Sequence, residues 1–184
     1  LPDAKERAMS KPRVATLWLD GCSGCHMSLL DTDESLIELL QAVELVYSPL
    51  IDIKEFPEGV DVALVEGALG SEEDLEKIRL VRARSKFVAA LGDCAVTGNV
   101  PSMRNQFGPQ AILERAYIEN ATIGHCPPSE RLPRLLERSV PIHEAIAVDL
   151  HIPGCPPSAE IIHYVLSELV AGRAPDLSAK VRFG

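Results

Sequence analysis

Residues 11–26 read KPRVATLWLDGCSGCH, an apolar run that stops abruptly and passes into a loop with two cysteines. The run over 11–19 is rich in strand-forming side chains, and Asp20-Gly21 is a turn signal. In the segment 28–42, leucine and isoleucine recur at helical intervals. We therefore expect a strand, a loop that carries cysteines, and a helix, in that order.

Further apolar stretches continue this alternation along the chain. Strands are predicted at 43–47, 60–66, 86–91 and 145–150, and helices at about 71–84, 109–120 and 158–172. A loop is expected after the strand at 86–91, and the prolines of 123–143 indicate an irregular, proline-rich excursion. Parallel neighbouring strands need crossover connections, so strands separated by helices imply a mostly parallel sheet with both faces covered.

The expected fold class is α/β: a flavodoxin-like, doubly wound, three-layer domain with a mostly parallel five-stranded sheet. We expect this domain over residues 12–172, with an N-terminal tail at 1–11 and a C-terminal tail at 173–184. In such folds ligands lie outside the carboxyl ends of the strands, so functional residues are expected there.

Composition excludes several classes of protein. The chain has 184 residues, of which 46% are hydrophobic and 24% charged, as in folded globular domains. A net charge of -9 without a long basic run disfavours nucleic-acid binding, which requires a basic face to neutralise phosphates. No stretch approaches the roughly 18 apolar residues of a membrane span, and the charged N-terminus lacks the apolar core of a secretory signal. We therefore expect a cytoplasmic protein without a membrane span.

Four of the five cysteines follow predicted strands. Cys22 and Cys25 follow the first strand, Cys94 the fourth and Cys155 the fifth. Because the carboxyl ends of parallel strands meet at one edge, the fold would bring these thiols together where ligands bind. An odd number of cysteines in a domain with an adequate core favours reduced thiols that serve as ligands. We predict that these four cysteines bind a metal cofactor.

Four thiolates suit either a structural zinc ion or an iron–sulfur cluster. All-cysteine zinc sites usually combine two Cys-x2-Cys pairs, whereas this chain joins one such pair to two isolated cysteines. Proline also follows Cys155, as it follows a ligand in bacterial ferredoxin motifs. An iron–sulfur cluster is favoured, and a zinc-stabilised interaction module is the alternative. Cys126 lies in a similar Gly-His-Cys-Pro-Pro stretch but follows no predicted strand, so we expect it to stay free.

Two further alternatives explain less of the sequence. A thioredoxin-type dithiol would need only Cys22 and Cys25 and would leave the other cysteines unexplained. An FMN phosphate in this loop would find hydroxyls only at Ser23 and Ser28, and Asp20 would repel it. Neither alternative accounts for all four cysteines.

Other residues near the predicted edge have two interpretations each. Gly21 and Gly24 either let backbone N–H groups approach cluster sulfurs or are ordinary turn glycines. His26 lies beside the cysteine loop, where it could tune a cluster. Glu66 ends the third predicted strand and is either a proton relay at the same edge or a solvated loop acid.

Three stretches form a specific joint pattern: DGCSGCHMSLLD at 20–31, GDCA at 92–95 and PGCPP at 153–157. Through them the sequence resembles, over about residues 12–172, the small subunit of NiFe hydrogenases. The resemblance implies that the four cysteines bind one proximal [4Fe-4S] cluster, which takes electrons from a NiFe centre in the large subunit. It also implies that this chain holds no catalytic residue for hydrogen, and that Met27, Leu29 and Val96 lie at the interface with the large subunit.

Two departures from the family pattern narrow the choice of subtype. His26-Met27 stands where many members carry Ser-Glu, whose Glu is linked to proton movement, so the resemblance identifies no proton route in this chain. No cysteine follows Cys155, so we expect no further cluster here and an electron exit through another subunit. The short chain and its cysteine loop resemble the cytoplasmic NAD-reducing (bidirectional) hydrogenases. That resemblance implies a hydrogen:NAD+ oxidoreductase complex, in which diaphorase subunits with iron–sulfur clusters and FMN reduce NAD(P).

The related cluster-bearing subunit of respiratory NADH:quinone oxidoreductase is an alternative within electron transfer. It has adjacent cysteines at the first ligand position. The stretch from Cys22 to Cys25 lacks such a pair.

Overall fold

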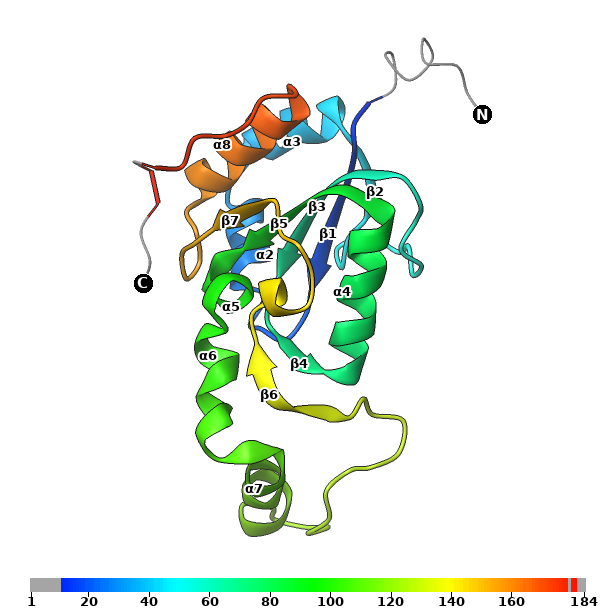
Figure 1. The fold of residues 1–184 in the computed structure, drawn as a ribbon, viewed down its shortest axis with the longest axis vertical. Helices are drawn as coiled ribbons and strands as arrows, with labels where there is room; N and C mark the ends of the chain where they lie inside the picture. Colours follow the sequence, from blue (N-terminus) through cyan, green and yellow to red (C-terminus); the bar gives the residue numbers. More distant parts are fainter. Residues whose placement is uncertain (1–10, 179, 182–184) are drawn as a thin grey trace.

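The computed structural model describes residues 11–178, 180 and 181. Most of the expected N-terminal tail, and part of the C-terminal one, lie outside these residues. The centre of the molecule is a five-stranded parallel sheet (Figure 1). Its strands, in spatial order, are β2 (Glu44–Tyr47), β1 (Arg13–Trp18), β3 (Val60–Glu66), β5 (Ser85–Leu91) and β7 (Leu150–Ile152). Numbered within the sheet, the order is 2-1-3-4-5, the flavodoxin-like order that the sequence predicts.

The carboxyl ends of four strands are in register across the sheet. Trp18 pairs with Glu66, Glu66 with Leu91, and Leu91 with Ile152. These residues are the last of β1, β3, β5 and β7. Every loop or helix that follows one of these strands therefore begins at the same edge.

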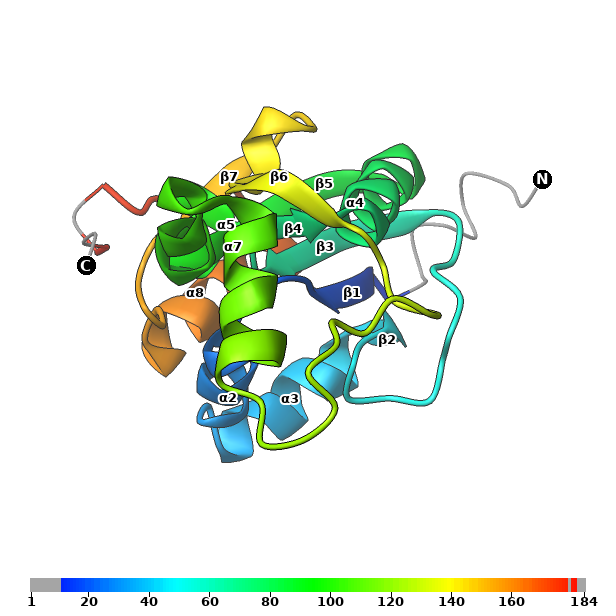
Figure 2. The same ribbon diagram turned by 90° about the horizontal axis from the view of Figure 1, so that it is seen from below.

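Helices cover both faces of the sheet, as Figure 2 shows. One face carries α2 (Gly24–Leu30), α3 (Glu34–Ala42) and α8 (Ala159–Val170). The other carries α4 (Glu72–Arg84) and α5 (Gly92–Thr97). Two apolar cores result: Leu29, Leu39 and Val165 pack with Leu64 and Ala89 on the first face, and Ile78, Val81 and Ala95 pack with Val65 and Val88 on the second. The three-layer prediction is thus confirmed.

An arm, residues 99–140, extends beyond the carboxyl edge of the sheet (Figure 1). It contains α6 (Asn99–Ser102), η1 (Met103–Gln106), α7 (Gly108–Glu114), the π-helical turn η2 (Arg115–Glu119) and β6 (Leu135–Val140). β6 returns antiparallel to β4 (Leu69–Ser71), and the Arg104 guanidinium donates hydrogen bonds to the carbonyls of Leu136 and Gly70, each at 3.0 Å. These contacts fasten the arm to the body of the molecule.

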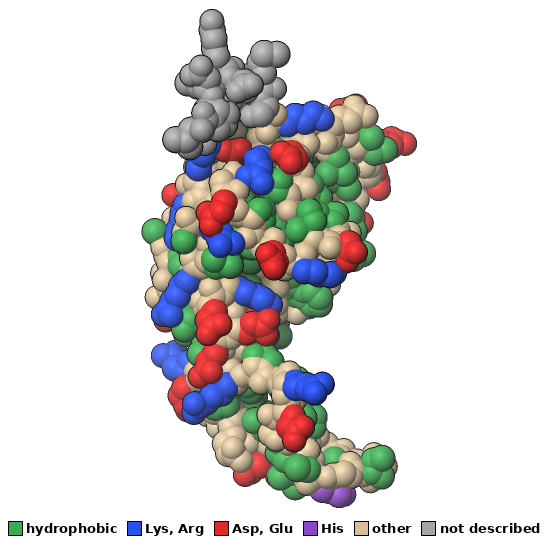
Figure 3. Space-filling model, turned by 90° about the vertical axis from the view of Figure 1, so that its right-hand side faces the viewer, with side chains coloured by type: hydrophobic (Ala, Val, Ile, Leu, Met, Phe, Trp, Pro, Cys, Tyr) green, Lys and Arg blue, Asp and Glu red, His purple; other side chains and the backbone are tan. Residues whose placement is uncertain are grey.

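The distribution of charged side chains on the surface agrees with the expectation from composition that the protein lacks a basic face. On the side shown in Figure 3, acidic and basic side chains are interspersed, and the arm projects from the body. No uniformly basic face appears on the part of that side that the structure describes. Among the described helices, none has the length and apolar character that crossing a membrane requires.

The predicted helix over 28–42 is wrong in its bounds, because two helices occupy this region. α2 begins earlier, at Gly24, and α3 starts at Glu34 after a turn. Asp33 in that turn has φ 52° and ψ -127°, a positive-φ conformation that an α-helix does not accommodate, so the helix is interrupted there. The loop expected after residue 91 is also wrong, since α5 begins directly at the end of β5.

The fifth strand and the excursion also differ from the sequence prediction. The strand is Leu150–Ile152 rather than 145–150, because Ala145, Ile146 and Val148 pack on the core from a loop after η3 (Ile142–Glu144). The alternating apolar pattern there reflects packing, not strand pairing. The proline-rich excursion of 123–143 is partly regular, since it contains the whole of β6.

Asp149 joins the last strand to the rest of the sheet. Its Oδ2 accepts hydrogen bonds from the Val88 backbone N–H at 2.7 Å and from Arg82 Nη1 at 2.6 Å. Burial alone would raise the pKa of Asp149, but these hydrogen bonds and the Arg82 charge outweigh it and lower the pKa. A carboxyl group with a lowered pKa stabilises the fold above its unfolded pKa of about 3.9, and this contribution is lost as pH falls through the folded value.

We predict that Asp149→Asn lowers the free energy of unfolding by about 1 kcal/mol at pH 7, a figure reduced for the screening of a side chain that is 37% exposed. Urea unfolding from pH 7 to pH 2 measures it, and the difference from wild type should shrink below about pH 4. Asp52→Asn is the control, because the Asp52–Lys54 pair is largely exposed. A deficit that persists undiminished at pH 2 would contradict the assignment.

Candidate metal centre

The four predicted ligand residues all lie at the carboxyl edge of the sheet. Cys22 is in the loop after β1, Cys25 is in the first turn of α2, Cys94 is in α5, and Cys155 is in the loop after β7. The sequence placed all four in loops, but Cys25 and Cys94 are helical, because α2 begins at Gly24 within the expected loop and α5 begins directly after β5. Cys25 is buried, Cys94 half-buried, and Cys22 and Cys155 exposed.

Gly92 marks the point where the cysteine-bearing segments meet. A Cβ atom placed on Gly92 would lie 2.2 Å from Cys25 Sγ, 3.5 Å from the Gly154 carbonyl oxygen and 3.7 Å from Pro157 Cδ. The residue itself has φ +81°, a conformation that favours glycine. The start of α5, the first turn of α2 and the loop around Cys155 are therefore in van der Waals contact around one residue without a side chain.

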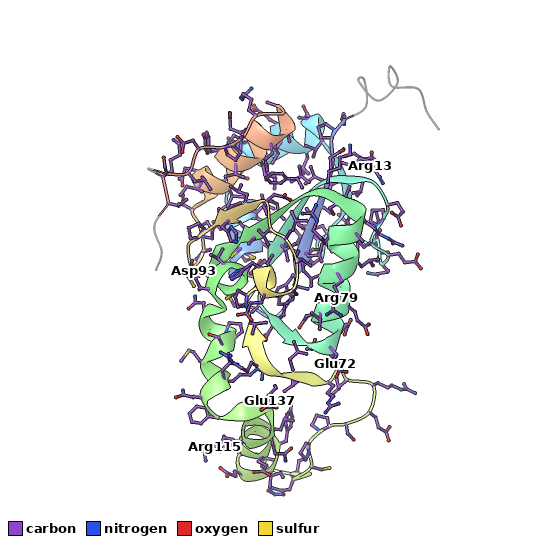
Figure 4. The ribbon with its side chains drawn as sticks, in the orientation of Figure 1. Arg13, Glu72, Arg79, Asp93, Arg115 and Glu137 are labelled. Atoms are coloured by element: carbon purple, nitrogen blue, oxygen red, sulfur yellow. The ribbon has the colours of Figure 1, made fainter. Side chains whose placement is uncertain are left out.

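Hydrogen bonds join the same segments. The Asp93 N–H donates to the Gly154 carbonyl at 2.9 Å, and the Gly154 N–H donates back to Asp93 Oδ1 at 2.7 Å. Ser28 Oγ donates to the Pro157 carbonyl at 2.6 Å, which joins α2 to the loop around Cys155. Figure 4 labels Asp93, which lies close to β7. This pairing of α5 with the loop after β7 fixes Cys94 relative to Cys155.

The thiols act on one another electrostatically. The pKa of the Cys94 thiol is raised to about 11, first by burial and then by the nearby Cys155 and Cys22 thiols. Burial likewise raises the pKa of Cys25, with added contributions from Glu66 and the other three thiols. Such mutual effects require proximity. A metal that holds these sulfurs as thiolates must therefore displace their protons.

Glu66 and His26 form a buried pair beside Cys25. The Glu66 side chain is 2% exposed, and its Oε1 accepts the Cys25 N–H at 3.2 Å. Its Oε2 accepts the His26 N–H at 2.9 Å and lies 2.5 Å from His26 Nδ1. Glu66 is therefore not a solvated loop acid, and its proximity to the cysteine edge is as the sequence suggested. The pairing with His26 could not be read from the sequence, because 40 residues separate them.

The two glycines of the cysteine loop have different roles. The Gly24 N–H donates toward Cys22 Sγ at 3.4 Å, as expected for a backbone group that approaches a ligand sulfur. Gly21 instead allows two backbone segments to pack closely, since a Cβ there would lie 3.3 Å from the Gly67 Cα. Of these two glycines, Gly24 is thus the one whose backbone N–H contacts a cysteine sulfur in the described structure.

The expected apolar interface is partly wrong. Met27 is 55% exposed beside the candidate centre, but Leu29 and Val96 are buried in the cores on opposite faces of the sheet. Both lie on the inward sides of their helices, which helical spacing alone could not reveal. Cys126, which we expected to stay free of the cluster, is exposed in the arm, and its Sγ lies 3.6 Å from the Pro127 carbonyl oxygen.

The donor set can be compared with the two cofactors considered. A zinc ion holds thiolates at about 2.3 Å, which draws four sulfurs tightly together. Within the described residues, no three His, Cys, Asp or Glu side chains are grouped closely enough for a single ion. The four thiols, which act on one another electrostatically, supply the cysteine ligands that a polynuclear iron–sulfur cluster takes.

Comparison with known proteins places the chain in a family. The model of the NADH ubiquinone oxidoreductase 20 kDa subunit family matches residues 22–169, and the chain belongs to this family. Within the family it groups with hydrogenase small subunits. The resemblance found in the three motifs is thereby confirmed, and the respiratory oxidoreductase alternative is not favoured.

Several hydrogenase subunits are similar to this chain over most of its length. The chain is 41% identical over 176 residues to the NAD-reducing hydrogenase HoxS subunit delta of Cupriavidus necator, covering 93% of this chain and 84% of that one. It is 42% identical over 171 residues to a subunit of the vhu F420-non-reducing hydrogenase of Methanocaldococcus jannaschii, covering 92% of this chain and 59% of the relative. A solved NAD+-reducing [NiFe]-hydrogenase contains a chain that matches with TM-score 0.90 and 38% identity, covering 95% of this chain and 99% of that one.

We predict that Gly92→Ala lowers the free energy of unfolding of the metal-free chain by about 3 kcal/mol or more. Left-handed backbone strain contributes about 1–2 kcal/mol, and the displaced Cys25 sulfur supplies the rest. Gly172→Ala is the matched control, because Gly172 has φ +72° but nothing within 4 Å of the added Cβ.

A double-mutant cycle isolates the contact between residues 92 and 25. Combining Gly92→Ala with Cys25→Ala should recover more than about 1 kcal/mol of the loss, since the clashing sulfur is absent. Urea unfolding of the two single variants, the double variant and the control provides the measurement. Additive losses would show that Cys25 does not lie against Gly92.

Proposed function

We propose that this chain is the electron-transfer small subunit of a NiFe hydrogenase and binds one proximal [4Fe-4S] cluster through Cys22, Cys25, Cys94 and Cys155. The contact of three cysteine-bearing segments around Gly92 carries the proposal. Family membership supports the class of protein. A relative from Archaeoglobus profundus, 29% identical over 183 residues, is named a hydrogenase iron-sulfur subunit.

A cluster bound at this edge would supply one-electron chemistry. The chain's own residues provide its surroundings. Buried Cys25 and half-buried Cys94 limit the access of water, and the Gly24 N–H directed at Cys22 Sγ stabilises added negative charge on that sulfur. Glu66, at the end of β3, fixes the start of α2 by accepting its backbone N–H groups. These residues would position and shield a cluster held by the four thiols.

The partner subunits follow from the same site. The exposed side chains of Met27 and Trp18 lie at the cysteine edge, and we infer that the large subunit with the NiFe centre covers them. Because relatives of this chain are named NAD-reducing hydrogenases, we also propose a diaphorase module with further clusters and FMN, which passes electrons to NAD(P). We also propose a cytoplasmic location and a cluster domain over residues 12–172.

Cysteine substitution tests the ligand set. We expect Cys22→Ala, Cys25→Ala, Cys94→Ala and Cys155→Ala each to reduce bound iron at least severalfold, because each removes one of four thiolates. Cys126→Ala is the matched control and should keep wild-type iron. The measurement is iron and acid-labile sulfide per chain after anaerobic reconstitution. Normal iron in Cys155→Ala with loss in Cys126→Ala would overturn the ligand assignment.

The electron route is tested in the assembled complex. We expect Cys94→Ala to abolish hydrogen-driven NAD reduction but to spare NADH oxidation by an artificial dye, because the dye takes electrons at the flavin of another subunit. As a control, the isolated cluster-loaded chain should take up no hydrogen. Loss of both reactions in an intact complex, or FMN bound to this chain alone, would contradict the scheme.

A further inference from the structure

The first turn of α2 is capped by a residue from another element. Ser23 precedes the helix with φ 65°, and within the described residues its side chain makes no capping hydrogen bond. The N–H groups of Cys25 and His26 would therefore lack acceptors, as the first N–H groups of any helix do. Both instead donate to the two oxygens of Glu66, the last residue of β3. The orientation of one carboxylate thus determines how the turn that carries Cys25 is held.

His26 holds that carboxylate in place. The His26 side chain is 5% exposed, and Nδ1 lies 2.5 Å from Glu66 Oε2. The other ring nitrogen, Nε2, lies 3.0 Å from Thr16 Oγ1, which donates to Ser48 Oγ at 2.9 Å. The ring is therefore fixed from both ends by buried partners on β1 and β3. A buried carboxylate with a fixed partner at one oxygen has few orientations open to it.

We propose that His26 is a positioning residue for the cluster: it fixes Glu66 so that both carboxylate oxygens cap the turn that carries Cys25. This inference rests on the proposed function, that the four cysteines bind the [4Fe-4S] cluster. His26 itself is not a ligand in this scheme. It acts through Glu66 on the Cys25 backbone. In this way it keeps the Cys25 sulfur in one position and the cluster in one environment.

The expected consequence is specific to the first turn. Without the imidazole, Glu66 can rotate and release the Cys25 and His26 N–H groups, while all four thiols remain. Iron binding should persist, but the Cys25 turn should open more often and the cluster should have more than one environment. A role confined to core packing would lower overall stability and leave the cluster environment uniform.

The test uses the full chain, loaded anaerobically with iron and sulfide. His26→Ala removes the imidazole, His26→Asn keeps a short side-chain donor that can reach Glu66, and His163→Ala on α8 is the matched histidine control. Hydrogen–deuterium exchange of the segment 23–29 measures opening of the turn. EPR of the dithionite-reduced chain measures the cluster environment. Thr16→Val, which replaces the hydroxyl next to Nε2 with a methyl group, is the second variant if His26→Ala does not fold.

We expect His26→Ala to retain its iron, to exchange segment 23–29 about tenfold faster or more, and to broaden or split the EPR signal. His26→Asn should recover most of both effects, Thr16→Val should show a smaller change in the same direction, and His163→Ala should match wild type. Wild-type exchange and EPR in both His26→Ala and Thr16→Val, or an Asn variant no better than Ala, would overturn the proposal. A wild-type chain that binds no [4Fe-4S] cluster would instead refute the proposed function on which it rests.

Discussion

The in-register ends of four parallel strands are the constraint on which the candidate centre depends. Trp18, Glu66, Leu91 and Ile152 lie in one row across the sheet, so the segments that follow β1, β5 and β7 begin side by side. Cysteines that are far apart in the sequence then need only a few residues to reach a common site. The segments approach one another most closely at Gly92, because a side chain on this residue would push Cys25 Sγ aside.

A buried carboxylate is the second determinant of the site. Burying Glu66 costs free energy that only full hydrogen bonding offsets. Two backbone N–H groups and the His26 ring supply that compensation, and all three lie in the turn that presents Cys25. The buried Glu66 carboxylate is thus compensated by the same turn of α2 that positions Cys25.

Much of this arrangement could be predicted from the sequence, because strand patterns are local. The strand at 60–66 and a mostly parallel sheet could be predicted from apolar runs that alternate with helices, and the observed strand order agrees with the flavodoxin-like order we expected. The convergence of the four cysteines followed from that topology. The break at Asp33 and the displacement of the fifth strand depend on backbone conformation and on loop packing, which apolar spacing does not encode. The His26–Glu66 pair and the burial of Leu29 depend on contacts between distant segments, and no local signal identifies these.

The proposed cluster is the central claim, and EPR spectroscopy of the anaerobically reconstituted wild-type chain, combined with metal analysis, tests it most directly. The account predicts about four iron and four sulfide ions per chain, and an EPR signal from a single cluster that appears on reduction with dithionite. One zinc ion per chain, with no iron and no signal on reduction, would contradict it.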